Sequence, residues 1–148
     1  KRIYDIKKRA DNKSMLVLLD DAGKIASYAD VPDIALDLIE VADKPTTIIY
    51  PGAKRLAPNL IAEDGTIGIR ITREEFTRSL IFRYNKPIVS TSANISGEPS
   101  PHFFGEISEE IKNAVDYIVD YRRNDHNPAA PSSIIKLGMG GEIQIIRK

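Results

Sequence analysis

The hydrophobic and polar positions of this chain recur at two spacings, one typical of strands and one typical of helices. Short apolar or β-branched runs that end in turn or polar residues predict strands at 15–19, 46–50, 66–71, 87–89, 117–119, 133–136 and 142–147. Apolar residues at helical spacing predict helices that begin near Pro32, Thr72 and Ser108, and residues 3–10 predict the end of another helix. This alternation predicts an α/β fold around a twisted sheet. The last two strands predict a hairpin across residues 138–141, which makes the expected sheet mixed.

The same pattern predicts finer features of these elements. Thr72 and Glu75 are three residues apart and predict a capping box at the start of a helix. The apolar faces predicted for the helices after Pro32 and Thr72 consist of Ile34, Leu38 and Val41, and of Phe76, Leu80 and Ile81. In residues 66–71, three isoleucines alternate with Thr66, Gly68 and Arg70, so this strand is expected to have one apolar and one polar face.

Composition narrows the class of protein. The chain has 148 residues, of which 42% are hydrophobic and 28% charged, as expected of one soluble globular domain. No apolar run approaches the ~20 residues that cross a bilayer, so no membrane association is expected and a cytoplasmic location is predicted. The sequence contains no cysteine, which excludes disulfides, thiolate metal sites and a cysteine nucleophile. Both histidines, His102 and His126, fall in predicted loops, so no protein metal site is expected.

The charge balance bears on possible partners. Lys plus Arg and Asp plus Glu number 21 each, so the net charge is zero. Proteins that bind nucleic acid through its phosphates usually carry a positive excess, so broad nucleic-acid binding is not expected. A local basic pocket for one small phosphorylated ligand remains compatible with a net charge of zero.

Four clusters are more polar than packing alone requires. They are Lys7–Arg9 at a helix end, Thr66 to Arg70 on one strand, residues 90–97 after a strand, and residues 131–133 with Arg147 in the last two strands. A lysine with an arginine suits a phosphate, an arginine in a central strand is costly without an anion, and small hydroxyls can donate to anionic oxygens. Each cluster alone also fits an ordinary alternative: a solvated helix end, an exposed strand face, a turn, or an edge hairpin. Because neither a Walker A sequence nor a catalytic triad is present, the clusters predict positioning of reactants and stabilisation of negative charge.

In this order, the clusters resemble the YrdC/TsaC family of threonylcarbamoyl-AMP synthases. The family's Ile-Tyr-x-x-Lys-x-Arg segment corresponds to residues 3–9, and its Thr-x-x-x-Arg strand corresponds to Thr66–Arg70. The Ser-Thr-Ser-Ala-Asn-x-Ser-Gly signature is intact at residues 90–97, and Pro131-Ser132-Ser133-Ile134-Ile135 and Ile145-Ile146-Arg147 complete the pattern. The resemblance spans nearly the whole chain. It implies one YrdC-like domain over residues 1–148, a twisted mixed β-sheet flanked by helices, with a concave ligand-binding basin.

The resemblance implies an activity, L-threonylcarbamoyladenylate synthase, which is a nucleotidyltransferase. Such an enzyme condenses L-threonine, bicarbonate and ATP to threonylcarbamoyl-AMP and pyrophosphate, and Mg²⁺ is expected to accompany ATP. The product is passed to tRNA-modifying transferase proteins for threonylcarbamoylation of adenosine 37. Catalytic roles are implied for Lys7, Arg9 and Arg70, and threonine binding is implied for Arg70 and Ser90. The ATP-binding residues implied by the resemblance are Lys7, Asn12, Thr66, Ser92, Asn94, Ser100 and Arg147.

The chain departs from the family pattern at its start. The Pro-Thr-(Asp/Glu)-Thr-x-Tyr-Gly-Leu segment, which helps form the threonine pocket in the family, is absent. An N-terminally truncated chain is therefore predicted, and the activity of this chain by itself is left open. Residues 43–47 replace the usual Pro-Gly-Pro-x-Thr, and Ser133 replaces a common threonine. The sequence indicates neither an oligomeric state nor an additional C-terminal domain.

Two alternatives stay open at this stage. One is a YrdC-like module that binds nucleotide or double-stranded RNA without synthase activity, which the salt dependence of RNA binding would identify. The other is a carbamoyl-transfer domain like those inside hydrogenase-maturation proteins, which the absence of flanking zinc-finger-like cysteines disfavours.

Overall fold

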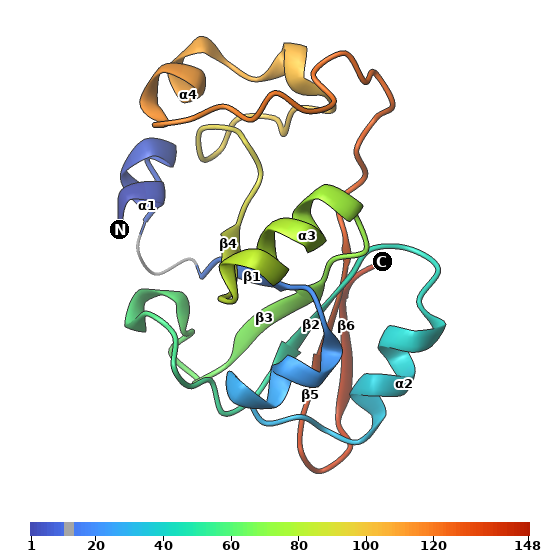
Figure 1. Cartoon of the computed structure of the whole chain (residues 1–148). Coiled ribbons are helices and arrows are strands. Elements are labelled where there is room, and N and C mark those ends of the chain that lie inside the picture. Colours follow the sequence, from blue (N-terminus) through green and yellow to red (C-terminus); the bar gives the residue numbers. More distant parts are fainter. Residues whose placement is uncertain (11–13) are drawn as a thin grey trace. The chain divides into compact units, whose positions relative to one another are not determined.

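A computed structural model describes residues 1–10 and 14–148 (Figure 1). The chain forms two compact units, each built from two stretches that lie far apart in the sequence. The sheet unit consists of Ser14–Ser90 and Ser132–Lys148, and the helical unit consists of Lys1–Lys13 and Thr91–Pro131. No helix of the described residues has the length and apolar character needed to cross a membrane.

Among the described residues, six strands form one sheet in the sheet unit. They are β1 (Leu16–Leu19), β2 (Thr46–Tyr50), β3 (Ile67–Ile71), β4 (Ile88–Ser90), β5 (Ser133–Leu137) and β6 (Ile143–Arg147). Their order is β4-β1-β3-β2-β5-β6, with β1 parallel to β3, β2 parallel to β5, and the other neighbours antiparallel. The predicted mixed sheet is confirmed, and so is the predicted hairpin, which is formed by β5 and β6.

One face of this sheet carries the core of the unit. Residues directly opposite each other in neighbouring strands lie on the same face, so the strand register assigns side chains to faces. Residues of the core face that are at most 2% exposed are Val17, Leu19, Ile48, Tyr50, Ile67, Ile69 and Leu137. The helices α2 (Ile34–Val41) and α3 (Glu75–Tyr84) and the 3-10 helix η1 (Ala22–Ser27) lie on this side of the sheet (Figure 1). They bury Ala35, Ile81 and Ile25 against it, and each fully buried large aliphatic side chain contributes about 1.5–3 kcal/mol.

The opposite face, called the cationic face below, carries Arg70 on β3, Lys136 on β5 and Arg147 on β6. The register places Arg70 opposite Thr47, Thr47 opposite Ile134, and Ile134 opposite Arg147. Arg70 and Arg147 therefore belong to one row of side chains across the sheet. A further 3-10 helix, η2 (Pro58–Leu60), precedes β3 in the chain.

The helical unit contains α1 (Arg2–Lys7), the 3-10 helix η3 (Phe104–Glu106) and α4 (Glu109–Ala114). Ser108 caps α4 as predicted, because its hydroxyl accepts a hydrogen bond from a backbone N–H of the first turn. Two exposed ion pairs link the α1 segment to the α4 segment: Arg2 with Asp116 and Lys8 with Glu110, each at 2.6 Å. These pairs are solvated and add little stability, whereas Tyr4 of α1 and Ile111 of α4 are buried.

The strand predicted at residues 117–119 is wrong. The segment has no regular structure, and Tyr117 is 78% exposed. The carbonyl oxygens of Ile118 and Val119 accept hydrogen bonds from the guanidinium of Arg123 at 2.7 and 3.0 Å. These carbonyl oxygens therefore bind a nearby side chain instead of the backbone N–H groups of a neighbouring strand.

The predicted cap of α3 is also wrong. The helix is capped by Glu74, whose carboxylate accepts from the backbone N–H groups of Phe76 at 3.2 Å and Thr77 at 2.8 Å. A carboxylate at a helix N-terminus is stabilised by the helix dipole. The backbone N–H of Thr72 instead donates to the carbonyl oxygen of Leu19, which keeps Thr72 attached to the sheet.

The apolar faces predicted for α2 and α3 are only partly buried. Ile81 is buried, whereas Phe76 and Leu80 are exposed. In α2 the buried residue is Ala35, whereas Val41 of the predicted face is 76% exposed. Helical spacing identifies an apolar stripe, but the orientation of each helix on the sheet decides which part of that stripe is covered.

Candidate functional site

The side chain of Lys7 anchors the loop of residues 91–98. Lys7 is the last residue of α1, which ends because Lys8 adopts a left-handed conformation (φ 51°). Lys7 is 3% exposed, and its Nζ donates to the carbonyl oxygens of Ser92 at 2.5 Å and Asn94 at 2.6 Å. Burial, and next the charge of Arg9, lower the pKa of Lys7. The buried ammonium is therefore stabilised by carbonyl oxygens of the loop.

Asn94 fixes the same loop from within. Its Nδ2 donates to the carbonyl oxygens of Ile95 at 3.1 Å and Glu98 at 2.8 Å, while its Oδ1 lies 3.4 Å from the Nζ of Lys7. The backbone N–H of Ser96 donates to the carbonyl oxygen of Lys7 at 2.8 Å. Lys7 and Asn94, which are far apart in the sequence, are thus brought together as the two supports of this loop.

The geometry of this loop leaves two backbone donors available. The N–H of a trans peptide points opposite to its C=O, and no described peptide bond is cis. Because the carbonyl groups of Ser92 and Asn94 point toward Lys7, the N–H groups of Ala93 and Ile95 point away from it. Neither N–H donates to any described residue. Two outward N–H groups of one loop that is backed by a positive charge are suited to an anionic oxygen.

The other predicted residues of the helical unit are Arg9, Ser92 and Ser100. Arg9 is half-buried and follows the turn at Lys8, with its backbone N–H donating to the carbonyl oxygen of Tyr4 at 3.0 Å. Ser92 and Ser100 are exposed. Asn12, predicted to bind ATP, lies outside the described residues.

On the cationic face of the sheet unit, Arg70 stands out because its charge has no partner among the described residues. It is half-buried between Thr47 of β2 and Leu18 of β1 in the register, and burial lowers the pKa of its guanidinium. Within the described part of the chain, the guanidinium makes neither a hydrogen bond nor an ion pair. A half-buried cation without a counter-charge costs stability, so the position favours an anionic ligand.

Ser90 lies on the same face as Arg70. It ends β4 opposite Leu16 of β1, whereas Arg70 is opposite Leu18, two residues further along the same strand. A Cβ added at Gly68, also on this face, would lie 3.4 Å from side-chain atoms of both Leu16 and Thr47. These two neighbours therefore approach the backbone at Gly68 closely.

Thr66 is buried at the start of β3 and is bound to an exposed carboxylate. Its Oγ1 donates to Asp64 Oδ1 at 2.6 Å, and its backbone N–H donates to the same oxygen at 3.1 Å. The other carboxylate oxygen accepts from Lys136 Nζ at 2.5 Å. The Lys136 ammonium, followed by the Thr66 hydroxyl, lowers the pKa of Asp64 to about 2.

Arg147 on the edge strand is held by the first residues of β5. Its Nε and Nη2 donate to the carbonyl oxygen of Ser132 at 2.9 and 2.7 Å. The buried hydroxyl of Ser132 in turn shares a 2.8 Å hydrogen bond with the hydroxyl of Thr47. This network orients Arg147 and leaves its Nη1 available to a ligand.

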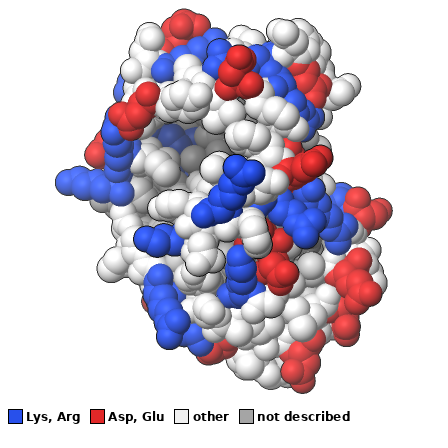
Figure 2. Space-filling view, in the orientation of Figure 1, with Lys and Arg blue, Asp and Glu red and all other residues white. Residues whose placement is uncertain are grey.

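The described side chains do not gather into a metal cage or one basic field. No group of three His, Asp or Glu residues within the described ranges is arranged to hold a metal ion. On the face seen in Figure 2, Lys and Arg side chains are interspersed with Asp and Glu. The site chemistry therefore rests on single cations, hydroxyls and amides at defined positions.

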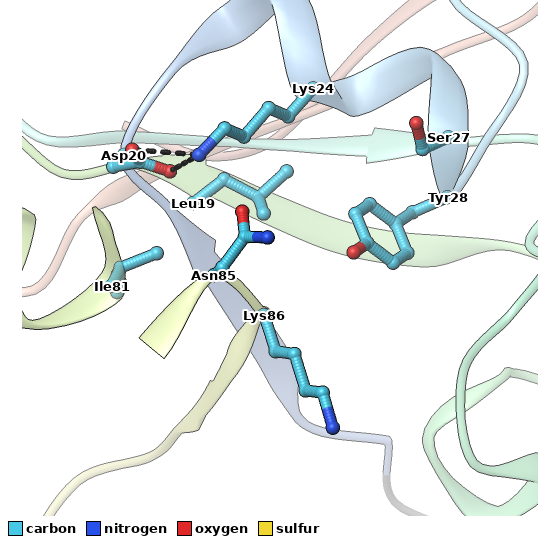
Figure 3. A pocket seen from close by; sticks show the side chains of 8 residues that line it. All are labelled: Leu19, Asp20, Lys24, Ser27, Tyr28, Ile81, Asn85 and Lys86. Atoms are coloured by element: carbon cyan, nitrogen blue, oxygen red, sulfur yellow. Dashed lines mark hydrogen bonds and ion pairs between the residues drawn. The ribbon is translucent and has the colours of Figure 1, made fainter. Parts of the chain in front are cut away.

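A cavity of about 220 Å³ lies in the sheet unit, at the carboxyl end of β1 (Figure 3). The buried carboxylate of Asp20 accepts from Lys24 Nζ at 2.9 Å with both oxygens. The other polar residues of the lining are Ser27, Tyr28, Asn85 and Lys86. None of the residues predicted for substrate binding lines this cavity. The cavity is lined by Leu19, a residue of the core face, and therefore lies on the side of the sheet opposite to the cationic face.

Comparisons with known proteins place the chain in a family. A family model described as Telomere recombination (Sua5_yciO_yrdC) matches residues 1–148. The chain is 38% identical over 138 residues to the "Putative threonylcarbamoyl-AMP synthase" of Methanocaldococcus jannaschii, covering 93% of this chain and 63% of that protein. It is 27% identical to the threonylcarbamoyl-AMP synthase of Pseudoalteromonas translucida, covering 96% of this chain and 76% of that protein.

Solved structures agree on the fold. The structure of P. abyssi Sua5 complexed with L-threonine has a TM-score of 0.79 and 23% identity, covering 92% of this chain and 40% of that chain. Full-length HypF in its phosphate- and nucleotide-bound form has a TM-score of 0.81 and 25% identity, covering 99% of this chain and 23% of that chain. The α/β fold predicted from the sequence is confirmed.

The chain belongs to the Sua5/YciO/YrdC family, because the family model matches it over its whole length. The family predicted from the sequence is therefore confirmed. The chain spans about 63% of the length of the M. jannaschii relative and about 76% of the P. translucida relative.

Several polar residues that hold the predicted ones in place were given no role from the sequence. They are Asp64, Lys136 and Thr47, together with Ser132, which belongs to the fourth polar cluster. A signal existed for Asp64, because an Asp two residues before a Thr commonly accepts from the backbone N–H of that residue. No comparable local signal exists for Lys136, since its contact with Asp64 depends on the pairing of β5 beside β2.

Proposed function

We propose that the protein is a threonylcarbamoyl-AMP synthase, which forms threonylcarbamoyl-AMP and pyrophosphate from L-threonine, bicarbonate and ATP. The observation that carries this proposal is the loop of residues 91–98, which closes around the Lys7 ammonium and turns the N–H groups of Ala93 and Ile95 outward. In a family member, such a loop fits the anionic groups of a triphosphate. The names of the two relatives support the same reaction.

The proposed reaction is a condensation followed by a phosphoryl substitution. The amine of threonine adds to bicarbonate and water is lost, which leaves a carbamate. A carbamate oxygen then attacks the α-phosphorus of ATP, the bond to the β-phosphate oxygen breaks, and pyrophosphate leaves with that electron pair. The carbamate and ATP are both anionic, so cations and oriented N–H groups that offset their repulsion lower the barrier.

Each residue has a proposed role in this scheme. Arg70 pairs with the threonine carboxylate, with Ser90 beside it, because the Arg70 guanidinium has no partner among the described residues. Arg9 and the outward N–H groups of the loop contact phosphate or carbamate oxygens. Thr66, Ser92, Ser100 and Arg147, with Asn12, contact the nucleotide.

Lys7 and Asn94 have a supporting role in this proposal. Since the short hydrogen bonds of Lys7 go to the loop carbonyl oxygens, its charge acts on the substrates through the loop. Asn94 uses its amide to close the same loop. Mg²⁺ that accompanies ATP would be held largely by phosphate oxygens and water.

The biological setting remains part of the proposal. Transfer of the product to tRNA-modifying proteins and a cytoplasmic location follow from the family resemblance. The alternative of an RNA-binding module is less well supported, because the net charge is zero. The likeness to HypF keeps a carbamoyl-transfer domain as the second candidate.

The proposal is tested by measuring pyrophosphate release from ATP by the purified protein. Release that requires both threonine and bicarbonate supports the synthase. Release that is unaffected by omission of threonine contradicts it, and activity with carbamoyl phosphate in place of bicarbonate favours the second candidate.

A further inference from the structure

The hydrogen bond between Thr66 and Asp64 has a fixed direction. A threonine hydroxyl carries one proton and two lone pairs, whereas an ionised carboxylate only accepts. The pKa of Asp64 is about 2, so the carboxylate is ionised at neutral pH. The 2.6 Å hydrogen bond from Thr66 Oγ1 to Asp64 Oδ1 therefore uses the only proton of the hydroxyl.

Two further hydrogen bonds hold the Asp64 carboxylate in place. The backbone N–H of Thr66 donates to the same carboxylate oxygen, and Lys136 donates to the other oxygen. Asp64 and Lys136 are both substantially solvated, so this ion pair contributes little to stability. Its main consequence is geometric, because it restricts the carboxylate to the orientation that binds Thr66.

With its proton engaged, Thr66 offers a ligand only lone pairs. A phosphate or carboxylate oxygen at neutral pH also offers only lone pairs, so it cannot hydrogen-bond to Thr66 Oγ1 in this state. The negative charge of Asp64 beside it further disfavours an anion. The group that meets Thr66 must therefore be a donor, a hydroxyl or an amino group.

We propose that Asp64 is a positioning residue that makes Thr66 a hydrogen-bond acceptor for a donor group of ATP, either a ribose hydroxyl or the adenine amino group. This inference rests on the proposed function, because it takes ATP as the ligand of Thr66. It assigns the base or ribose, and not the triphosphate, to Thr66.

The test compares nucleotides that lack one donor at a time. Calorimetry measures the affinity of the wild-type protein and of Thr66→Val and Asp64→Ala for ATP, 2′-deoxyATP, 3′-deoxyATP and purine riboside triphosphate, which lacks the amino group. We expect the wild type to bind one of these analogues about tenfold more weakly than ATP, as for one lost hydrogen bond. In Thr66→Val and Asp64→Ala, that analogue and ATP should bind within about threefold of each other.

Two further variants keep the test independent of folding defects. Asp64→Asn keeps an acceptor for Thr66 and should retain part of the discrimination. Lys136→Met leaves the Asp64 to Thr66 bond in place and should retain most of it. The inference is overturned if Asp64→Ala discriminates between the nucleotides as the wild type does, or if the wild type binds every analogue as it binds ATP. If the wild type binds no ATP at all, the proposed function fails, and this inference fails with it.

Discussion

The Nζ of Lys7 lies 2.5 Å from the carbonyl oxygen of Ser92, which is 85 residues further along the chain. The same ammonium also donates to the carbonyl oxygen of Asn94 at 2.6 Å, so it binds two carbonyl groups of the loop of residues 91–98. One buried cation therefore determines the conformation of a loop that is formed by distant residues. This relationship makes Lys7 a structural support as well as a source of positive charge.

Replacement of Lys7 by Ala should destabilise the protein. The substitution leaves the carbonyl groups of Ser92 and Asn94 without their donor, and each such loss costs about 1–3 kcal/mol. Urea unfolding measures the change in the free energy of unfolding. Lys8→Ala is the matched control, because the Lys8 side chain makes a solvated pair with Glu110, and it should change stability by no more than about 0.5 kcal/mol. Equal effects of the two variants would contradict the anchoring role of Lys7.

Replacement of Arg70 by Met should weaken threonine binding without destabilising the protein. Threonine affinity should fall by about 1.5–3 kcal/mol, because a charge-assisted hydrogen bond is lost. The free energy of unfolding should stay the same or rise, because a half-buried charge without a counter-ion is removed. Calorimetry with threonine and urea unfolding give the two values. Arg83→Met, an exposed change on α3, serves as the control and should leave threonine affinity unchanged; a variant of Arg70 that binds threonine normally would rule out the assignment.

The ionisation of Asp64 should be visible in the pH dependence of the protein. Its pKa is lowered from 3.8 to about 2 in the folded protein, so the folded state holds fewer protons than the unfolded state between these values. The stability that Asp64 contributes is thus complete above pH 3.8 and is lost as the pH falls toward 2. Carbon-13 NMR of the carboxyl group measures the pKa directly. In Lys136→Met the pKa should move toward 3.8, and an unchanged value would mean that Lys136 does not hold the carboxylate.

The buried hydroxyl pair of Thr47 and Ser132 should behave as one unit. Thr47→Val removes one partner and leaves the Ser132 hydroxyl unpaired, which costs about 1–3 kcal/mol. Adding Ser132→Ala removes the orphaned group as well, so the double variant should lose less than the sum of the single losses. Thr46→Val at the neighbouring, more exposed threonine is the control. Strictly additive losses in a urea-unfolding cycle would show that the two hydroxyls do not depend on each other.

The sheet could be predicted from the sequence because its strands carry a strong local pattern. β2 has the predicted bounds, and β3 alternates buried Ile67 and Ile69 with Gly68 and Arg70 as expected. The register then places Ser90, Arg70 and Arg147 on one face of the sheet, which the sequence order alone did not indicate. Periodic burial is a local property, whereas the pairing of strands is decided by the whole sheet.

Other features could not be predicted because they depend on distant partners. Residues 117–119 have the composition of a strand, but the carbonyl groups there bind Arg123 instead of a neighbouring strand. The sequence analysis expected Lys7 to face a ligand, whereas the short hydrogen bonds of its ammonium go to loop carbonyl oxygens. A sequence shows which groups are polar, but the tertiary structure decides which of those groups are already paired.

The central claim is tested most directly by detecting the product itself. The purified protein is incubated with ATP, carbon-13 bicarbonate and nitrogen-15 threonine, and the nucleotides are analysed by mass spectrometry. The account predicts an adenylate that carries both labels, formed together with pyrophosphate. Consumption of ATP without a doubly labelled adenylate, or no consumption of ATP, would contradict it.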